Sequence, residues 1–80
     1  ARDNRITAES MLTVLEHFYP YRHLMRHKGR QYYKTGNLRG VSTRAGYLSS
    51  SLGGDYRFVV ILNSKGSSSD IVKIIERYLP

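Results

Sequence analysis

The residues of this chain that are best suited to chemistry lie in one short run, Lys34-Thr35-Gly36-Asn37. The Lys34 ammonium attracts negative charge and can help to move a proton, and the Thr35 hydroxyl can donate a hydrogen bond to a substrate oxygen. Gly36 has no side chain, so a ligand backbone can lie against the strand as an added edge. The Asn37 backbone N–H would then point into the same cleft, where it could stabilise an oxyanion. The run predicts a carboxylate clamp beside an oxyanion-binding group.

A longer pattern surrounds this run, since the chain continues as Leu38-Arg39-Gly40-Val41 and then reaches Ala45-Gly46-Tyr47. These residues resemble the third active-site motif of the penicillin-recognising serine peptidases, Lys-Thr-Gly on a strand lining the cleft. They are similar in particular to the D-alanyl-D-alanine carboxypeptidase and endopeptidase branch, the penicillin-binding protein 4-like branch. There Lys-Thr-Gly is followed by a small polar residue, Leu, any residue, Gly and Val, and then by Ala-Gly-Tyr or Ala-Gly-Phe. Residues 2–8 also look like the stretch that follows a Ser-Gly-Leu-Ser segment in that branch.

The resemblance implies a site and a reaction. Lys34 would act by electrostatics and proton transfer, and Thr35 would bind the substrate carboxylate. Gly36 and Asn37 would make backbone contacts. A serine elsewhere in the protein would be acylated by a D-Ala-D-Ala peptide of the peptidoglycan stem, or by a β-lactam, before hydrolysis. The resemblance implies no metal and no cofactor, and a location outside the cytoplasmic membrane, in the periplasm or at the cell surface.

The chain departs from the family pattern in two respects. Asn37 stands where Thr or Ser is commoner, which changes the side chain but keeps the backbone N–H. No serine has a lysine three positions later, so the family's Ser-X-X-Lys nucleophile is not among these 80 residues. Asn4 is a candidate remnant of the second motif, without an assigned role. We therefore expect residues 1–80 to be the C-terminal part of a larger peptidase domain, inactive without its missing N-terminal part.

The charge distribution leaves a different function open. The net charge is +7, and no acidic residue lies between Glu16 and Asp55. A surface of one sign concentrates anions, which here are nucleic acid, an acidic cell-surface polymer or a substrate carboxylate. Tyr32, Tyr33 and Tyr47 flank basic residues as in nucleic-acid binders, although tyrosine is also an ordinary strand residue. The alternative is a small basic nucleic-acid-binding α+β domain, which does not account for the glycine spacing after Lys34.

Several other side chains are predicted to have no chemical role. His23 and His27 are four positions apart and could share a helix face, but no acidic or cysteine partner lies nearby in sequence, so we predict exposed histidines rather than a zinc site. Arg39 and Arg44 are predicted on a solvated face, where either could also hold an acidic wall peptide. The chain has no cysteine, and hence neither a disulfide nor a thiol nucleophile.

Hydrophobic periodicity predicts the elements that would position the motif. Thr7 begins a helix over residues 8–19 that Pro20 ends, and Ser67 with Asp70 forms a capping box before a final helix. Residues 21–30 are predicted as a loop with about one helical turn. Three strands are predicted, at residues 31–35, 41–48 and 56–62, the last as a central strand because nearly every position is apolar. The predicted class is α+β, in the order helix, three-stranded antiparallel sheet, helix.

Overall fold

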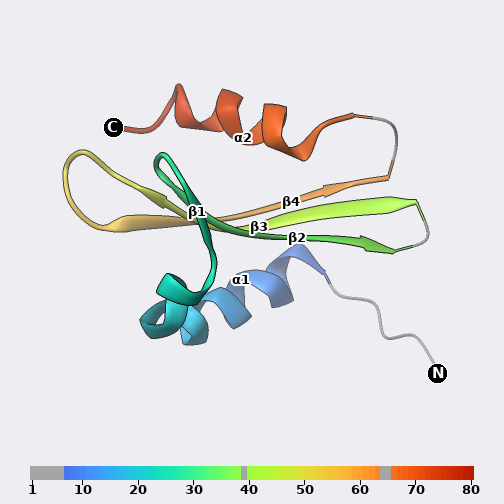
Figure 1. Cartoon of the computed structure of the whole chain (residues 1–80), viewed down its shortest axis with the longest axis horizontal. Helices are drawn as coiled ribbons and strands as arrows, with labels where there is room; N and C mark the ends of the chain where they lie inside the picture. The colour runs from blue at the N-terminus through green and yellow to red at the C-terminus, as the bar shows by residue number, and fades with distance from the viewer. Residues whose placement is uncertain (1–6, 39, 64–65) are drawn as a thin grey trace.

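The structure is a computed structural model that describes residues 7–38, 40–63 and 66–80. Its strands form one antiparallel sheet in the order β1-β2-β3-β4, with α1 on one face and α2 on the other (Figure 1). The predicted α+β class is confirmed. The elements are α1 (Ala8–Phe18), the 3-10 helix η1 (Tyr19–Leu24), β1 (Arg26–Lys28), β2 (Gln31–Leu38), β3 (Val41–Ser49), β4 (Asp55–Leu62) and α2 (Ser68–Glu76).

Both helices begin at the predicted caps. The Thr7 hydroxyl accepts from the Ser10 N–H at 3.0 Å, and the Ser10 hydroxyl accepts from the Thr7 N–H at 3.1 Å, which completes a capping box. The Ser67 hydroxyl accepts from the Asp70 N–H at 3.2 Å at the start of α2. None of the described helices is long and apolar enough to cross a membrane.

The prediction of three strands is wrong, because the chain forms a fourth strand, β1, within the segment predicted as a loop. β1 pairs antiparallel with β2 through Arg26↔Tyr33, His27↔Tyr32 and Lys28↔Gln31. Gly29 turns the chain between the two strands with a φ of 58°, a conformation that glycine adopts without steric cost. All three β1 side chains are exposed, so the strand carries no apolar alternation by which to predict it.

The apolar run of β4 was predicted to make it central, and this is also wrong. β4 lies at the edge of the sheet, and β3 is paired on both sides. The run is apolar because a helix covers each face of β4. Val59 packs in the α1-side cluster, and Phe58 and Val60 pack in the α2-side cluster.

The sheet separates two hydrophobic clusters. The α1-side cluster is built on Leu15, Ala45 and Tyr47. The α2-side cluster contains buried residues of β3, β4 and α2, namely Leu48, Phe58, Val60 and Val72. β3 contributes to both, so the central strand anchors both helices.

Candidate functional site

The predicted motif lies on a stretch of β2 that has a neighbour on one side only. β1 pairs with β2 as far as Tyr33, whereas β3 pairs with it along its whole length. Within the described residues, no strand pairs with the other side of β2 from Lys34 onward. Lys34, Thr35, Gly36 and Asn37 are all exposed. We call this stretch, residues 34–37, the open edge.

The sheet register determines which backbone groups face the open edge. Opposite residues in an antiparallel ladder alternate between hydrogen-bonded and non-hydrogen-bonded pairs. The Ser49 N–H donates to the Arg30 carbonyl at 2.9 Å, one position before the Gln31↔Leu48 pair. Counting along the ladder from there, the backbone groups of Lys34 and Gly36 point toward β3. Those of Thr35 and Asn37 point toward the open edge, which is the orientation that the oxyanion hypothesis requires of the Asn37 N–H.

The side chains of the motif approach the open edge from two faces of the sheet. Tyr32 packs with the α1-side cluster and Tyr33 with the α2-side cluster. Because side chains alternate along a strand, Lys34 lies on the α1 face and Thr35 on the α2 face. A group bound at the open edge can therefore meet the Lys34 ammonium from one face and the Thr35 hydroxyl from the other.

Glycines allow the motif strand and β3 to lie close together. A Cβ on Gly46 would lie 1.8 Å from the Tyr32 carbonyl oxygen and 2.9 Å from the Tyr33 Cα, so only glycine fits against β2 there. Gly40 has a φ of 78° at the turn into β3. A Cβ on Gly36 would lie 3.0 Å from the Thr43 Oγ1 atom, a side-chain contact that is tight but adjustable.

Arg44 is not on a solvated face, which corrects the prediction. Its guanidinium donates to the Gln31 Oε1 atom at 3.0 Å and to the Ser68 hydroxyl at 3.2 Å, and it lies 4.3 Å from the centre of the Tyr33 ring. Gln31 is buried and also donates to Glu76 at 3.4 Å. Arg44 therefore ties β2 and β3 to the start of α2. Arg39 and Asn4 lie outside the described residues.

The histidines do not share a helix face. His23 lies in η1, and His27 lies in β1, where its ring stacks on Tyr32 with centroids 4.3 Å apart. No cluster of three or more His, Cys, Asp or Glu side chains able to hold a metal occurs among residues 7–38, 40–63 and 66–80.

The tyrosines near the motif pack within this chain, as ordinary strand residues do. Tyr47 is fully buried and its hydroxyl donates to the Leu15 carbonyl. Tyr32 and Tyr33 are half-buried beneath His27 and Arg44. A base could not stack on Tyr47, and the other two rings already carry side chains of this chain.

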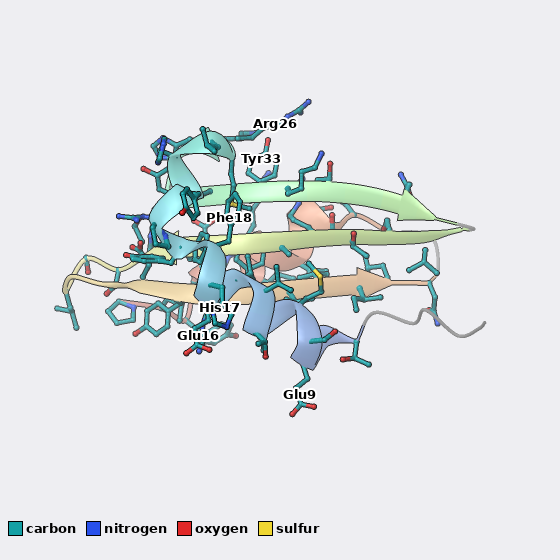
Figure 2. All side chains as sticks on the ribbon, turned by 90° about the horizontal axis from the view of Figure 1, so that it is seen from below. Glu9, Glu16, His17, Phe18, Arg26 and Tyr33 are labelled. Carbon is teal, nitrogen blue, oxygen red and sulfur yellow. The ribbon has the colours of Figure 1, made fainter. Side chains whose placement is uncertain are left out.

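Arg26, which the sequence pattern did not single out, lies where the open edge begins. It is the first residue of β1 and is opposite Tyr33. Figure 2 shows its side chain extending away from the body of the molecule. A shallow groove of about 200 Å³ near the other end of β1 is lined by none of the motif residues. Its charged lining comprises Lys28, Arg30, Lys73 and Glu76.

Comparisons with models of protein families, with curated proteins and with solved structures found no match to this chain. The geometry of β2 and the residues on it are therefore the observations on which a function has to rest.

Proposed function

We propose that this chain is the substrate-binding C-terminal part of a serine-type D-alanyl-D-alanine carboxypeptidase or endopeptidase, which acts on peptidoglycan stem peptides outside the cytoplasmic membrane. The open edge of β2 is the observation that supports this proposal most directly. Backbone groups of Thr35 and Asn37 face it, and the side chains of Lys34 and Thr35 flank it. An extended peptide can add to such an edge through main-chain hydrogen bonds.

The chemistry of the motif suits a peptide that ends in a carboxylate. The carboxylate would lie beside the Lys34 ammonium and the Thr35 hydroxyl, and the scissile carbonyl would lie near the Asn37 N–H. A serine oxygen from the missing part would attack that carbonyl carbon, and the bond to the terminal D-Ala nitrogen would break as the amine takes up a proton. Water would then hydrolyse the acyl-enzyme ester. Lys34 would assist the proton transfer, and no metal or cofactor is needed.

Exposed apolar side chains support the proposal that a further part of the domain packs on this chain. Ile71 and Ile74 of α2 are 37% and 48% exposed, and Tyr78 beyond it is 83% exposed. Ile61 is 41% exposed on β4, whose outer edge is unpaired among the described strands. The missing N-terminal part would cover these surfaces and would supply the serine. On this proposal, the 80-residue chain alone is inactive.

A nucleic-acid-binding domain is the second candidate, because Arg26, His27 and Lys28 of β1 are all exposed. Such a domain would bind DNA or RNA with an affinity that falls steeply as salt rises. It gives no role to the open edge of β2.

The proposal is tested by labelling with a fluorescent penicillin. The full-length gene product is captured with an antibody raised against this chain and is labelled in parallel with the 80-residue chain. We expect a covalent label on the full-length protein, which unlabelled penicillin prevents, and no label on the chain alone. A folded full-length protein that takes up no label would rule out the peptidase and would leave nucleic-acid binding as the function to test.

A further inference from the structure

We infer that Arg26 selects substrates whose leaving residue carries a free carboxylate. This inference rests on the proposed function and assigns a residue to the recognition of the substrate at the open edge.

The position of Arg26 follows from the register of β1. Arg26 is directly opposite Tyr33, so their side chains share the α2 face of the sheet, and Thr35 is the next β2 residue on that face. Diagonal neighbours of this kind have Cα atoms about 7–8 Å apart, which a long side chain can span. The Arg26 guanidinium can therefore reach a group that is bound beside the Thr35 hydroxyl. In Figure 2 it extends outward and is not folded back onto the molecule.

Arg26 also closes one end of the open edge. The chain turns away at Met25, whose N–H donates to the Arg22 carbonyl at 3.0 Å and whose side chain packs in the α1-side cluster. A peptide added antiparallel to β2 would lie in line with β1, and its C-terminal end would point at Arg26. Because β1 occupies the positions opposite Tyr33 and before, the added main chain must end beside Thr35. A guanidinium at that end provides the charge that a terminal carboxylate needs.

The guanidinium of Arg26 is available for this role. In the part of the chain that the structure describes, no hydrogen bond or ion pair engages it, and the residue is exposed. Other arginines are held by the fold. Arg30 donates to the carbonyls of Ser49 and Pro80, and Arg22 donates to the Tyr19 carbonyl.

The experiment compares two peptides that differ only in the charge at their C-terminus. The ¹⁵N-labelled chain is titrated with N-acetyl-D-Ala-D-Ala and with the C-terminal amide of the same peptide. We expect the acid to bind on the order of tenfold more tightly than the amide, as for a charge-assisted hydrogen bond at a partly hydrated site, and to shift the Thr35 and Asn37 amide signals. Arg26→Gln should weaken binding of the acid several-fold more than binding of the amide, and should leave only the smaller preference for the acid that the Lys34 ammonium provides. Lys28→Gln, which removes the same charge at the other end of β1, should leave the preference intact.

The inference is overturned if the unmodified chain shows no preference for the acid, if Arg26→Gln retains that preference undiminished, or if neither peptide shifts the Thr35 and Asn37 signals. The ratio of kcat/KM for the two peptides, measured for the same variants of the full-length protein, is an independent readout. The failure of the inference is distinguishable from that of the proposed function. A full-length protein that takes up penicillin but is indifferent to Arg26→Gln refutes only the inference. A chain that prefers the acid through Arg26, in a protein that takes up no penicillin, refutes only the peptidase.

Discussion

The two halves of β2 differ in almost every physical respect. Residues 31–33 pair with a strand on both sides, and their side chains are buried or half-buried. Among the described strands, residues 34–37 pair with β3 alone, and their side chains are exposed. The first half therefore positions the strand, and the second half is free to bind a ligand.

The difference shows why a charged motif can occupy a strand without harming the fold. An unpaired edge invites association with other chains, and a lysine on such an edge discourages it. Lys34 can serve that protective purpose as well as the proposed one, since both need an exposed charge at the same place. If the division between the halves is real, substitutions beside the first half should cost stability. Substitutions in the second half should cost ligand binding.

The largest expected effect is that of Gly46→Ala beside the first half. The new Cβ would lie 1.8 Å from the Tyr32 carbonyl oxygen, and that backbone is held by both neighbouring strands. We expect the free energy of unfolding to fall by about 3 kcal/mol or more in urea denaturation. Gly36→Ala is the matched control in the second half, where the Thr43 side chain can move aside, and should cost less than about 1 kcal/mol. Equal losses would show that the two halves are equally constrained.

The next effect is that of Arg44→Met. The substitution leaves the buried Gln31 Oε1 atom without its donor and removes the link to Ser68. An unsatisfied buried acceptor costs about 1–3 kcal/mol, and we expect a loss of about 2 kcal/mol in thermal or urea unfolding. Arg77→Met removes the same charge from an exposed position and should change stability by less than about 0.5 kcal/mol. If both variants lose the same amount, the network around Gln31 contributes nothing beyond surface charge.

The sequence was enough to predict elements that carry their own local signal. The caps at Thr7 and Ser67 were predicted from residue type, and the structure has both hydrogen bonds. β1 could not be predicted, because a strand of three exposed basic side chains is held only by its pairing with β2. The apolar run of β4 predicted a central strand, because such a run indicates burial on both faces of a strand. The run does not indicate whether the strand also has a neighbour on each side, and β4 is buried by the two helices instead.

The candidate site was predictable in its residues and not in its geometry. Residue types alone indicated what Lys34 and Thr35 could bind. Their strand has an open edge because β1 begins only at Arg26. The preceding residue, Met25, packs in the α1-side cluster instead, a tertiary contact with no local signature. Arg44 was misassigned for the same reason, because its partners Gln31 and Ser68 are distant in sequence.

A smaller effect, and one that depends on pH, is expected at Tyr47, which lies opposite Tyr32 of the first half. Tyr47→Phe removes the hydrogen bond to the Leu15 carbonyl and should cost about 1 kcal/mol at neutral pH. Burial raises the pKa of Tyr47 above its usual 10.0, and the hydrogen bond to Asp55, with desolvation, raises the pKa of Tyr19.

The raised pKa values of Tyr19 and Tyr47 predict how the free energy of unfolding changes at alkaline pH. A folded-state pKa above the unfolded value favours the protonated form in the folded state. The stabilisation that each raised pKa gives to the folded state is therefore complete below pH 10. It is lost as the pH rises from there through the folded pKa. We expect urea stability to fall above pH 10, and to fall less in Tyr47→Phe, while Tyr21→Phe on the exposed surface keeps the full loss. An unchanged alkaline loss in Tyr47→Phe would show that its burial does not oppose ionisation.

The smallest expected effect on stability is that of Thr35→Val in the second half. The two side chains have nearly the same shape, valine suits a strand at least as well, and no hydrogen bond of the Thr35 hydroxyl is described in this structure. The free energy of unfolding should therefore change by less than about 0.5 kcal/mol. In the full-length protein the same substitution should slow penicillin labelling about tenfold or more, because it removes a donor to the carboxylate. A loss of stability above about 1 kcal/mol would show that Thr35 is a structural residue. The second half of β2 would then contribute to stability as the first half does. If neither the stability nor the labelling rate changes, the second half of β2 is not needed for stability, and Thr35 does not bind the substrate carboxylate.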